Sequence, residues 1–152
     1  MIFESSQSEW NSRVLSVLRI VVAALFIEHG LQKLFGIPAG AHPMPPVALM
    51  SQFGLAGVLE TFGGTAFLLG LFTRPIAFLL CGEMAVTYFQ FHLPRGFYPI
   101  NNGGEVVVLF CFIFLYFLFA GAGVWSIDAV LGKSRRANRP SPSHDRSSAY
   151  PR

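Results

Sequence analysis

Four long apolar stretches, separated by short segments rich in glycine, proline and asparagine, make up most of this 152-residue chain. A helix rises about 1.5 Å per residue, so about 20 apolar residues are needed to cross the roughly 30 Å of hydrocarbon in a bilayer. The pattern therefore predicts four membrane-spanning helices. They are expected at about residues 14–35, 51–72, 75–92 and 103–120.

The breaks between the stretches carry residues that end or begin helices. Glycine and proline interrupt a helical backbone, and proline suits the first turn of a helix because its missing N–H has no partner there. Such residues lie at 36–40, 73–75, 101–104 and 121–123. The four helices form one membrane domain, expected over residues 14–131 after an N-terminal tail at 1–13.

The composition supports a membrane protein. Hydrophobic residues make up 53% of the chain and charged residues only 12%, whereas about a quarter of the residues of a soluble domain are charged. The mean hydropathy is +0.52. One compact bundle would use nearly the whole chain, so no second domain is expected.

The basic residues indicate how the helices are oriented, because cytoplasmic segments of membrane proteins carry an excess of Lys and Arg. Most of them lie in the N-terminal tail, the second connection and the C-terminal tail, namely Arg13, Arg74, Lys133, Arg135, Arg136, Arg139, Arg146 and Arg152. The expected fold is an all-α integral membrane protein, an antiparallel bundle of four transmembrane helices with both termini in the cytoplasm.

The C-terminal segment 132–152 is rich in Ser, Pro and Arg and has almost no apolar residues, so a disordered basic cytoplasmic tail is expected there. Its positive charges would be attracted to anionic lipids at about 1 kcal/mol per charge. The lipid bilayer is thus the expected partner, and no nucleic acid is expected. Ser126 and Asp128, just before this tail, can start a short surface helix.

Each predicted span contains a single glutamate: Glu28, Glu60, Glu83 and Glu105. A carboxylate in hydrocarbon is costly, so such residues usually face a bundle interior or a wet cavity. Counting from the span ends places the four carboxylates about 9, 13, 18 and 3 Å below the outer boundary, in that order. This ladder predicts a polar cavity that is open on the outer side and closed by apolar packing on the inner side.

Other polar residues share helix faces with these glutamates. His29 and Lys33 are four residues apart and lie on one face, beside Gln32. The full set of candidate cavity or ligand-binding residues is Glu28, His29, Gln32, Lys33, Glu60, Glu83, Asn101, Asn102 and Glu105. Small residues let membrane helices approach closely, so helix-packing positions are expected at Gly57, Gly63 and Gly64 around Glu60.

Several of these residues also have a structural interpretation. Asn102 could cap the fourth helix, with Glu105 reaching back to its N–H. Lys33 and Arg19 lie near span ends and could extend to the interface. Glu28 could simply pair with a neighbouring basic group.

Glu60 and Glu83 are the deepest of the glutamates and have no basic residue nearby in sequence. Each must therefore find a partner across the bundle or stay protonated.

The sequence predicts no redox or metal centre. Counting depth places Cys81 and Cys111 about 12 Å apart, too far for a disulfide, so both are expected to be small apolar residues. His29, His42 and His92 lie near the outer face without the spacing of metal ligands. No nucleotide-binding loop or zinc-protease sequence occurs, and no intrinsic cofactor is expected.

Six short runs together resemble the signature segments of the DoxX family. They are Leu18–Ile20, His29–Phe35, Gly57–Gly64, Leu69–Arg74, Asn101–Glu105 and Gly121–Asp128. They occur in the family's order and cover the chain from about Arg13 to Leu131. Where a proline is expected in the Gly-x-Gly stretch after the fourth helix, this chain has Ala122.

The resemblance implies a small four-helix protein of the bacterial inner membrane. Some members are related to the small membrane subunit of thiosulfate:quinone oxidoreductase, so the resemblance implies a partner in an oxidoreductase complex and contact with quinone. The motif positions carried over by the resemblance are His29, Gly30, Lys33, Glu60, Gly63, Gly64, Arg74, Asn101, Gly104, Glu105, Ser126 and Asp128. Glu28 and Glu83 rest on the depth argument alone.

Three functions fit these observations. The first is a non-catalytic membrane subunit of an oxidoreductase complex, whose outer-half cavity binds a quinone head group or a small polar ligand. The second is a permeation or transport protein for small solutes. The third is a membrane scaffold without chemistry. The sequence leaves open which further protein it contacts, an oxidoreductase or other copies of itself.

Overall fold

The computed structural model describes residues 2–39 and 47–137, and within these ranges the chain is helical and contains no strand. The all-α class is therefore confirmed for this part of the chain. The elements are α1 (Ile2–Phe35), α2 (Gln52–Val58), η1 (Leu59–Gly63), α3 (Gly64–Leu69), α4 (Thr73–Thr87), η2 (Tyr88–His92), η3 (Leu93–Arg95), α5 (Pro99–Asn102), α6 (Glu105–Ala120) and α7 (Ile127–Ala137).

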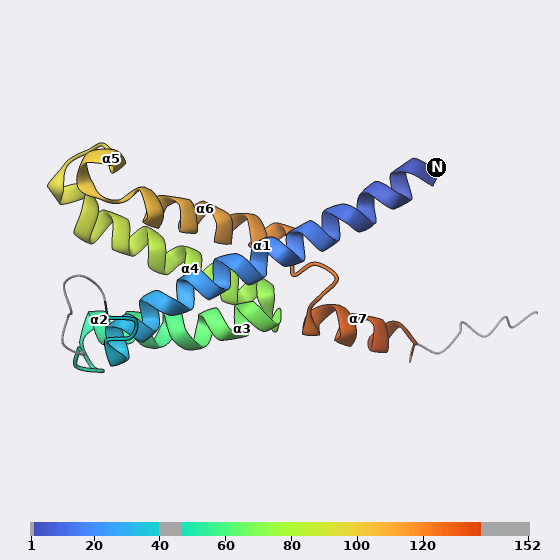
Figure 1. Ribbon diagram of the computed structural model, residues 1–152, viewed down its shortest axis with the longest axis horizontal. Helices are drawn as coiled ribbons and strands as arrows, with labels where there is room; N and C mark the ends of the chain where they lie inside the picture. Colours follow the sequence, from blue (N-terminus) through green and yellow to red (C-terminus); the bar gives the residue numbers. More distant parts are fainter. Residues whose placement is uncertain (1, 40–46, 138–152) are drawn as a thin grey trace, which may run out of the picture.

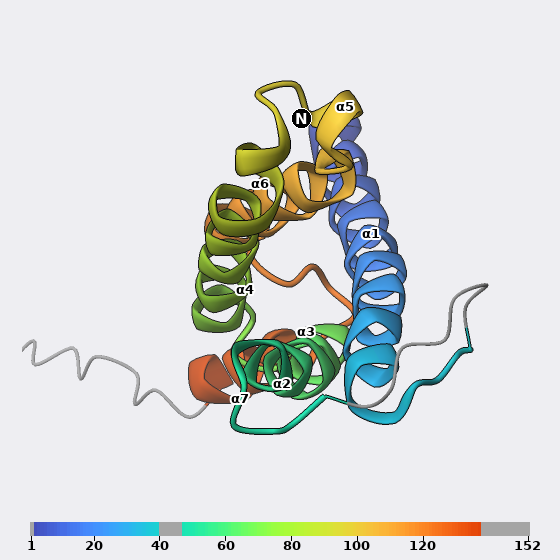
Figure 2. The same ribbon diagram turned by 90° about the vertical axis from the view of Figure 1, so that its left-hand side faces the viewer.

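Several consecutive elements form continuous rods. The π-helical turn η1 joins α2 to α3, and the π turn η2 extends α4. The chain passes along α1, back along α2–η1–α3, forward along α4 and back along α6 (Figure 1). Seen from one end, these four rods surround the long axis of the molecule (Figure 2). We call the two ends of the molecule the α5 end and the α7 end.

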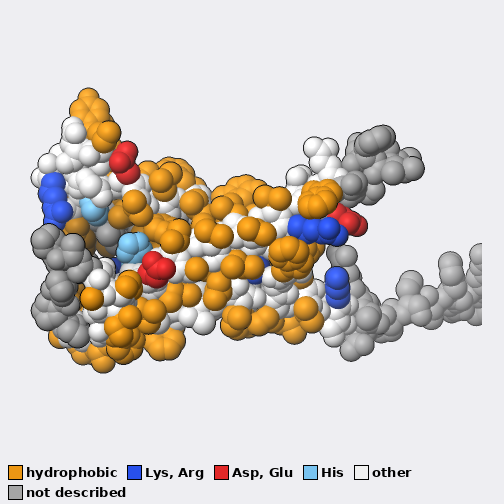
Figure 3. Space-filling view, viewed as in Figure 1, with side chains coloured by type: hydrophobic (Ala, Val, Ile, Leu, Met, Phe, Trp, Pro, Cys, Tyr) orange, Lys and Arg blue, Asp and Glu red, His pale blue; other side chains and the backbone are white. Residues whose placement is uncertain are grey.

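Two helical stretches of the described chain are long and apolar enough to cross a membrane. They are Gln7–Phe35, with 29 residues, and Thr73–Arg95, with 23 residues, and the apolar helix Glu105–Ala120 is shorter. Large hydrophobic side chains such as Phe62, Phe78 and Phe112 are exposed along the sides. The face drawn in Figure 3 is mostly hydrophobic along its middle, and the basic side chains gather mainly toward the ends.

The α7 half of the molecule is closed by an aromatic core. The ring centroids of Phe26 and Phe114 are 4.8 Å apart, and Phe67 packs edge-on against Phe114 and Phe117 at 5.2 and 5.0 Å. Edge-to-face packing of this kind is favourable beyond the area it buries. Leu80 of α4 is fully buried in the same core.

One interpretation of the sequence was that the Arg19 side chain extends to the membrane interface, and this interpretation is wrong. The side chain is 1% exposed, and the guanidinium donates to the carbonyls of Ala122, Leu68 and Trp125, the last two at 3.2 and 2.6 Å. Because the carbonyls at the end of a helix lack partners, one buried Arg can join α1, α3 and the loop after α6.

Asp128 ties α7 to the start of α4. Its two carboxylate oxygens accept from the backbone N–H groups of Phe72 at 2.9 Å and Thr73 at 2.8 Å. Phe72 has a φ of 47°, a left-handed conformation that residues other than glycine adopt rarely. The carboxylate therefore caps α4 and holds its strained first turn.

The predicted surface helix after Ser126 is confirmed as α7, but it is longer than expected. The Ser126 hydroxyl accepts from the Ala129 N–H at 3.1 Å, as an N-cap does. A capped helix propagates easily once begun, so α7 continues to Ala137, and the expectation of disorder is wrong for residues 133–137. The rest of the predicted tail, including Arg139, Arg146 and Arg152, lies outside the described residues, as does His42.

The predicted separation of the two cysteines is also wrong, because the Sγ atoms of Cys81 and Cys111 are 3.7 Å apart, although both cysteines are free, as expected. Counting from the outer boundary assumed a fourth helix long enough to cross the whole bilayer, but α6 has only 16 residues. Counted from the α7 end, both cysteines lie about eight residues from the ends of antiparallel helices, which places them at the same level.

We expect Arg19→Met to lower the free energy of unfolding by about 3 kcal/mol, because three carbonyls, one of them fully buried, would lose their donor. The measurement is the thermal unfolding of the detergent-solubilised protein. Arg13→Met is the matched control, since Arg13 lies on the same helix and is exposed. Equal losses for the two variants would contradict the role given to Arg19.

We expect mild oxidation of the membrane-embedded protein to link Cys81 and Cys111 within one chain, because a small side-chain shift closes the 3.7 Å gap. Mass spectrometry of peptides from the non-reduced protein detects the link, and Cys81→Ser is the control. Formation of dimers alone, with no intrachain link, would show that α4 and α6 are not paired in this register.

Candidate functional site

Two glycines bring the first two rods close together at the α5 end. A Cβ atom added to Gly30 of α1 would lie 2.6 Å from the backbone N of Thr61 and 2.9 Å from the Gly57 carbonyl. A Cβ on Gly57 would lie 3.1 Å from the Cβ of Lys33. The bare backbones therefore allow the contact that places Lys33 beside Glu60.

Lys33 of α1 and Glu60 of η1 form a buried ion pair between Nζ and Oε1. Glu60 is 2% exposed, while the Lys33 side chain is 22% exposed. Lys33 therefore points to a carboxylate and not to the interface, and Glu60 has found the partner across the bundle that its depth required. The second carboxylate oxygen, Oε2, is buried and has no hydrogen-bond partner among the described residues.

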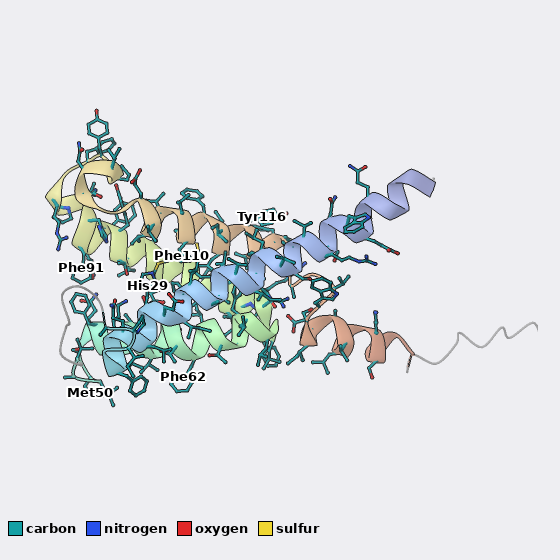
Figure 4. All side chains as sticks on the ribbon, viewed as in Figure 1. His29, Met50, Phe62, Phe91, Phe110 and Tyr116 are labelled. Atoms are coloured by element: carbon teal, nitrogen blue, oxygen red, sulfur yellow. The ribbon has the colours of Figure 1, made fainter. Side chains whose placement is uncertain are left out.

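A first cavity of about 370 Å³ opens above this pair, and we call it the polar cavity. Its walls include four aromatic rings, those of Phe26, Phe53, Phe91 and Phe110, together with Met84, Val106 and Val107. Its polar lining consists of His29, Lys33, Glu60, Thr87, His92 and Arg95. Figure 4 shows His29, Phe91 and Phe110 together in the α5 half of the molecule.

A second cavity of about 260 Å³ lies between α2 and α4, and we call it the side cavity. Glu83 lines it, and both oxygens of the Glu83 carboxylate are buried without a hydrogen-bond partner in the described part of the chain. Lys33, Phe53, Thr87 and Phe91 line both cavities. Lys33 therefore lines both cavities. The polar cavity also contains the carboxylate of Glu60, and the side cavity contains that of Glu83.

Two contacts connect α2 to η2 where the cavities meet. The ring centroids of Phe53 and Phe91 are 4.9 Å apart, and the Gln52 amide donates to the Gln90 carbonyl oxygen. These contacts fix the wall that the two cavities share.

The other predicted site residues lie elsewhere. Glu28 is exposed and lines neither cavity, whereas its neighbour His29, which is also exposed, lines the polar cavity. Gln32 donates to the Pro38 carbonyl at 3.3 Å. Asn101 is exposed on α5.

Asn102 and Glu105 do not form the reciprocal cap that was considered. The Asn102 amide donates to the Gly96 carbonyl at 2.7 Å and its oxygen accepts from the Gly104 N–H at 2.8 Å. The Asn102 side chain is therefore engaged in this short turn and does not cap α6. Glu105 is exposed in the first turn of α6 and lines neither cavity.

The predicted packing glycines lie at helix contacts. A Cβ on Gly63 would be 3.0 Å from the Leu80 side chain of α4, and one on Gly64 would be 2.8 Å from Ile27 of α1. The α2–η1–α3 rod therefore packs against a helix on each side through bare backbone.

Sequence reasoning missed the apolar walls of the site. Four Phe residues do not stand out in a chain with 16 of them. The π turn that contains Glu60 was also missed, and such turns are frequent at functional sites. His92, which was considered from the sequence only as a metal ligand, and Arg95 also line the polar cavity, and they are the only basic side chains of their connecting segment.

The arrangement suits a small ligand with an aromatic or apolar body and a polar group. Its body would pack against the Phe rings, and its polar group would meet Lys33 and the carboxylates. In the described part of the chain, no three His, Cys, Asp or Glu side chains are grouped to hold a metal ion.

Comparison with known proteins decides the family. The family model described as DoxX matches residues 14–93, more than half of the chain. The chain belongs to the DoxX family. The matched region of this DoxX protein contains Lys33, Glu60 and Glu83, and with them both cavity carboxylates.

Three relatives are similar to most of the chain. An uncharacterized protein of Haemophilus influenzae is 44% identical over 117 residues, which cover 75% of this chain and 87% of the relative. An uncharacterized membrane protein of Mycobacterium tuberculosis is 30% identical over 139 residues, covering 79% and 82%. The inner membrane protein YqjF of Escherichia coli is 31% identical over 126 residues, covering 77% and 91%. No solved structure matches significantly.

Proposed function

We propose that this DoxX protein crosses the inner membrane of a bacterium four times, with both termini in the cytoplasm. The α2–η1–α3 rod and α6 run between the two longer helices in alternating directions (Figure 1). At 18 and 16 residues they would rise about 27 and 24 Å, close to the thickness of the hydrocarbon core.

The described basic residues support this orientation. Arg74 donates to the Phe119 carbonyl at the end of α6, and Lys133 lies on α7. Arg13 lies one turn of α1 from Ser16, which contacts Trp125. All three therefore belong to the α7 end, which the positive-inside rule places in the cytoplasm. The two cavities then lie in the periplasmic half of the molecule.

The proposed function is that of a non-catalytic membrane subunit of an oxidoreductase, which holds a quinone head group or a similar small polar ligand in the polar cavity. The observation that carries the proposal is the buried Lys33–Glu60 pair at the base of a cavity with aromatic walls. A volume of about 370 Å³ lies in the range of small-molecule sites.

The side chains of the polar cavity fit such a ligand. A ring would pack against Phe53, Phe91 and Phe110, and Lys33 would donate to an oxygen on the ring. Glu60 could exchange a proton with that oxygen when its charge changes. Electrons would come from the partner oxidoreductase.

The aromatic core disfavours the permeation alternative. The rings of Phe26, Phe110 and Phe114 pack against one another directly beneath the polar cavity. A solute moving toward the cytoplasm would have to displace a packed core, so a binding site that is closed at its base fits the structure better.

The test is the quinone content of the full-length protein, extracted with native lipid into nanodiscs and analysed by mass spectrometry. We expect the wild type to retain about one quinone per chain, and Glu60→Gln to retain at least about tenfold less, because the buried charge that orders Lys33 is lost. Glu105→Gln is the matched control and should behave as wild type.

Equal quinone retention by wild type and Glu60→Gln would refute the cavity as the binding site. A wild type without quinone, together with a Glu60→Gln variant that loses only thermal stability, would instead support the scaffold alternative.

A further inference from the structure

The side cavity has an exposed apolar rim. Leu55 of α2 and Leu79 and Val86 of α4 line it, and they are 57%, 50% and 48% exposed. Figure 2 shows α2 and α4 as neighbours on the outside of the molecule. In a bilayer, a molecule that reaches Glu83 by this route passes from hydrocarbon, between apolar side chains, to a carboxylate.

The base of the two cavities has more acceptors than donors. Three buried carboxylate oxygens, Oε2 of Glu60 and both oxygens of Glu83, have no hydrogen-bond partner among the described residues. Lys33 contacts the remaining oxygen of Glu60. A buried acceptor without a donor is costly, so a suitable ligand is one that brings hydrogen-bond donors.

The two cavities adjoin one another at a single aromatic wall. Phe53 and Phe91 line both, and their rings are in contact. Lys33 and Thr87 are the polar groups on both sides of this wall. A ring that enters the side cavity from the bilayer therefore meets Glu83 first and reaches the Lys33–Glu60 pair by displacing Phe53 or Phe91.

We propose that the side cavity is a lateral opening to the bilayer, through which a lipid-soluble ring with hydroxyl groups binds, so that the site prefers a hydroquinone to the corresponding quinone. The hydroxyls donate to Glu83 and to the free oxygen of Glu60. This inference rests on the proposed function, because it names the form of the ligand and the route to the same site.

The first test compares three probes on the wild-type protein in nanodiscs: an alkyl-hydroquinone, its dimethyl ether and the alkyl-quinone. Equilibrium binding is measured by competition with the radiolabelled hydroquinone under anaerobic conditions. The hydroquinone should bind at least about tenfold more tightly than either analogue, since the lost hydrogen bond to the charged carboxylate of Glu60 is worth about that factor or more.

The second test uses Glu83→Gln, which keeps the shape of the side chain and replaces an acceptor by an amide donor. The preference for hydroquinone over quinone should fall about tenfold. Glu28→Gln is the matched control, because Glu28 is exposed and lines neither cavity. The comparison of probes on the wild type needs no variant, so it tests the preference for the hydroquinone even if Glu83→Gln does not fold.

The route is tested with Leu79→Trp, which narrows the rim, and with Phe78→Trp as its exposed neighbour outside both cavities. The association rate of the hydroquinone should fall at least about fivefold in Leu79→Trp and should stay unchanged in Phe78→Trp. An unchanged rate would overturn the lateral route.

The remaining outcomes separate this inference from the proposed function. Equal affinity for hydroquinone and ether, or tighter binding of the quinone, would overturn the preference for donors and leave the quinone site standing. Failure of all three probes to bind would overturn both proposals.

Discussion

The buried ion pair between Lys33 and Glu60 is the interaction on which the α5 half of the molecule depends. A lysine and a glutamate are each expensive to remove from water, and their pairing offsets much of that cost. The pair forms because Gly30 and Gly57 let α1 and η1 approach to backbone contact. Once it is formed, it fixes the base of the polar cavity and leaves the other oxygen of Glu60 buried, with no hydrogen-bond partner among the described residues. Glu83 adds a second carboxylate on the far side of the same lysine, so this end of the molecule has an excess of acceptors.

The two ends of the molecule use polar groups in opposite ways. At the α7 end, Arg19 and Asp128 satisfy backbone groups at helix termini, and the core is closed by packed rings. At the α5 end, buried carboxylate oxygens lie beside open volume. A bundle that is closed by packed rings at one end and has buried carboxylate oxygens beside open volume at the other is suited to holding a ligand at the second end. The membership of the chain in the DoxX family agrees with this organisation but does not itself name the ligand.

The sequence predicts part of this arrangement well, and the reasons are physical. Carboxylates in apolar helices are so costly that Glu60 and Glu83 could be singled out from depth alone, and helical spacing placed Lys33 and His29 on one face. Depth counting failed for Cys81 and Cys111 because it assumed helices of equal length, whereas α6 is short. The aromatic walls could not be recognised because phenylalanine is common throughout the chain. Arg19 was misjudged because closeness to a helix end does not reveal which carbonyls of other segments lie within reach.

The most direct test of this account is a double-mutant cycle of Lys33→Met, Glu60→Met and the double variant, followed by thermal unfolding of the protein in nanodiscs. Each single substitution leaves one buried charge without its partner, whereas the double substitution leaves an apolar contact. The account predicts that the double variant is more stable than either single variant, with a coupling energy of about 1.5 kcal/mol or more. Losses that add within about 0.5 kcal/mol would show that the two side chains do not interact, and would contradict the account.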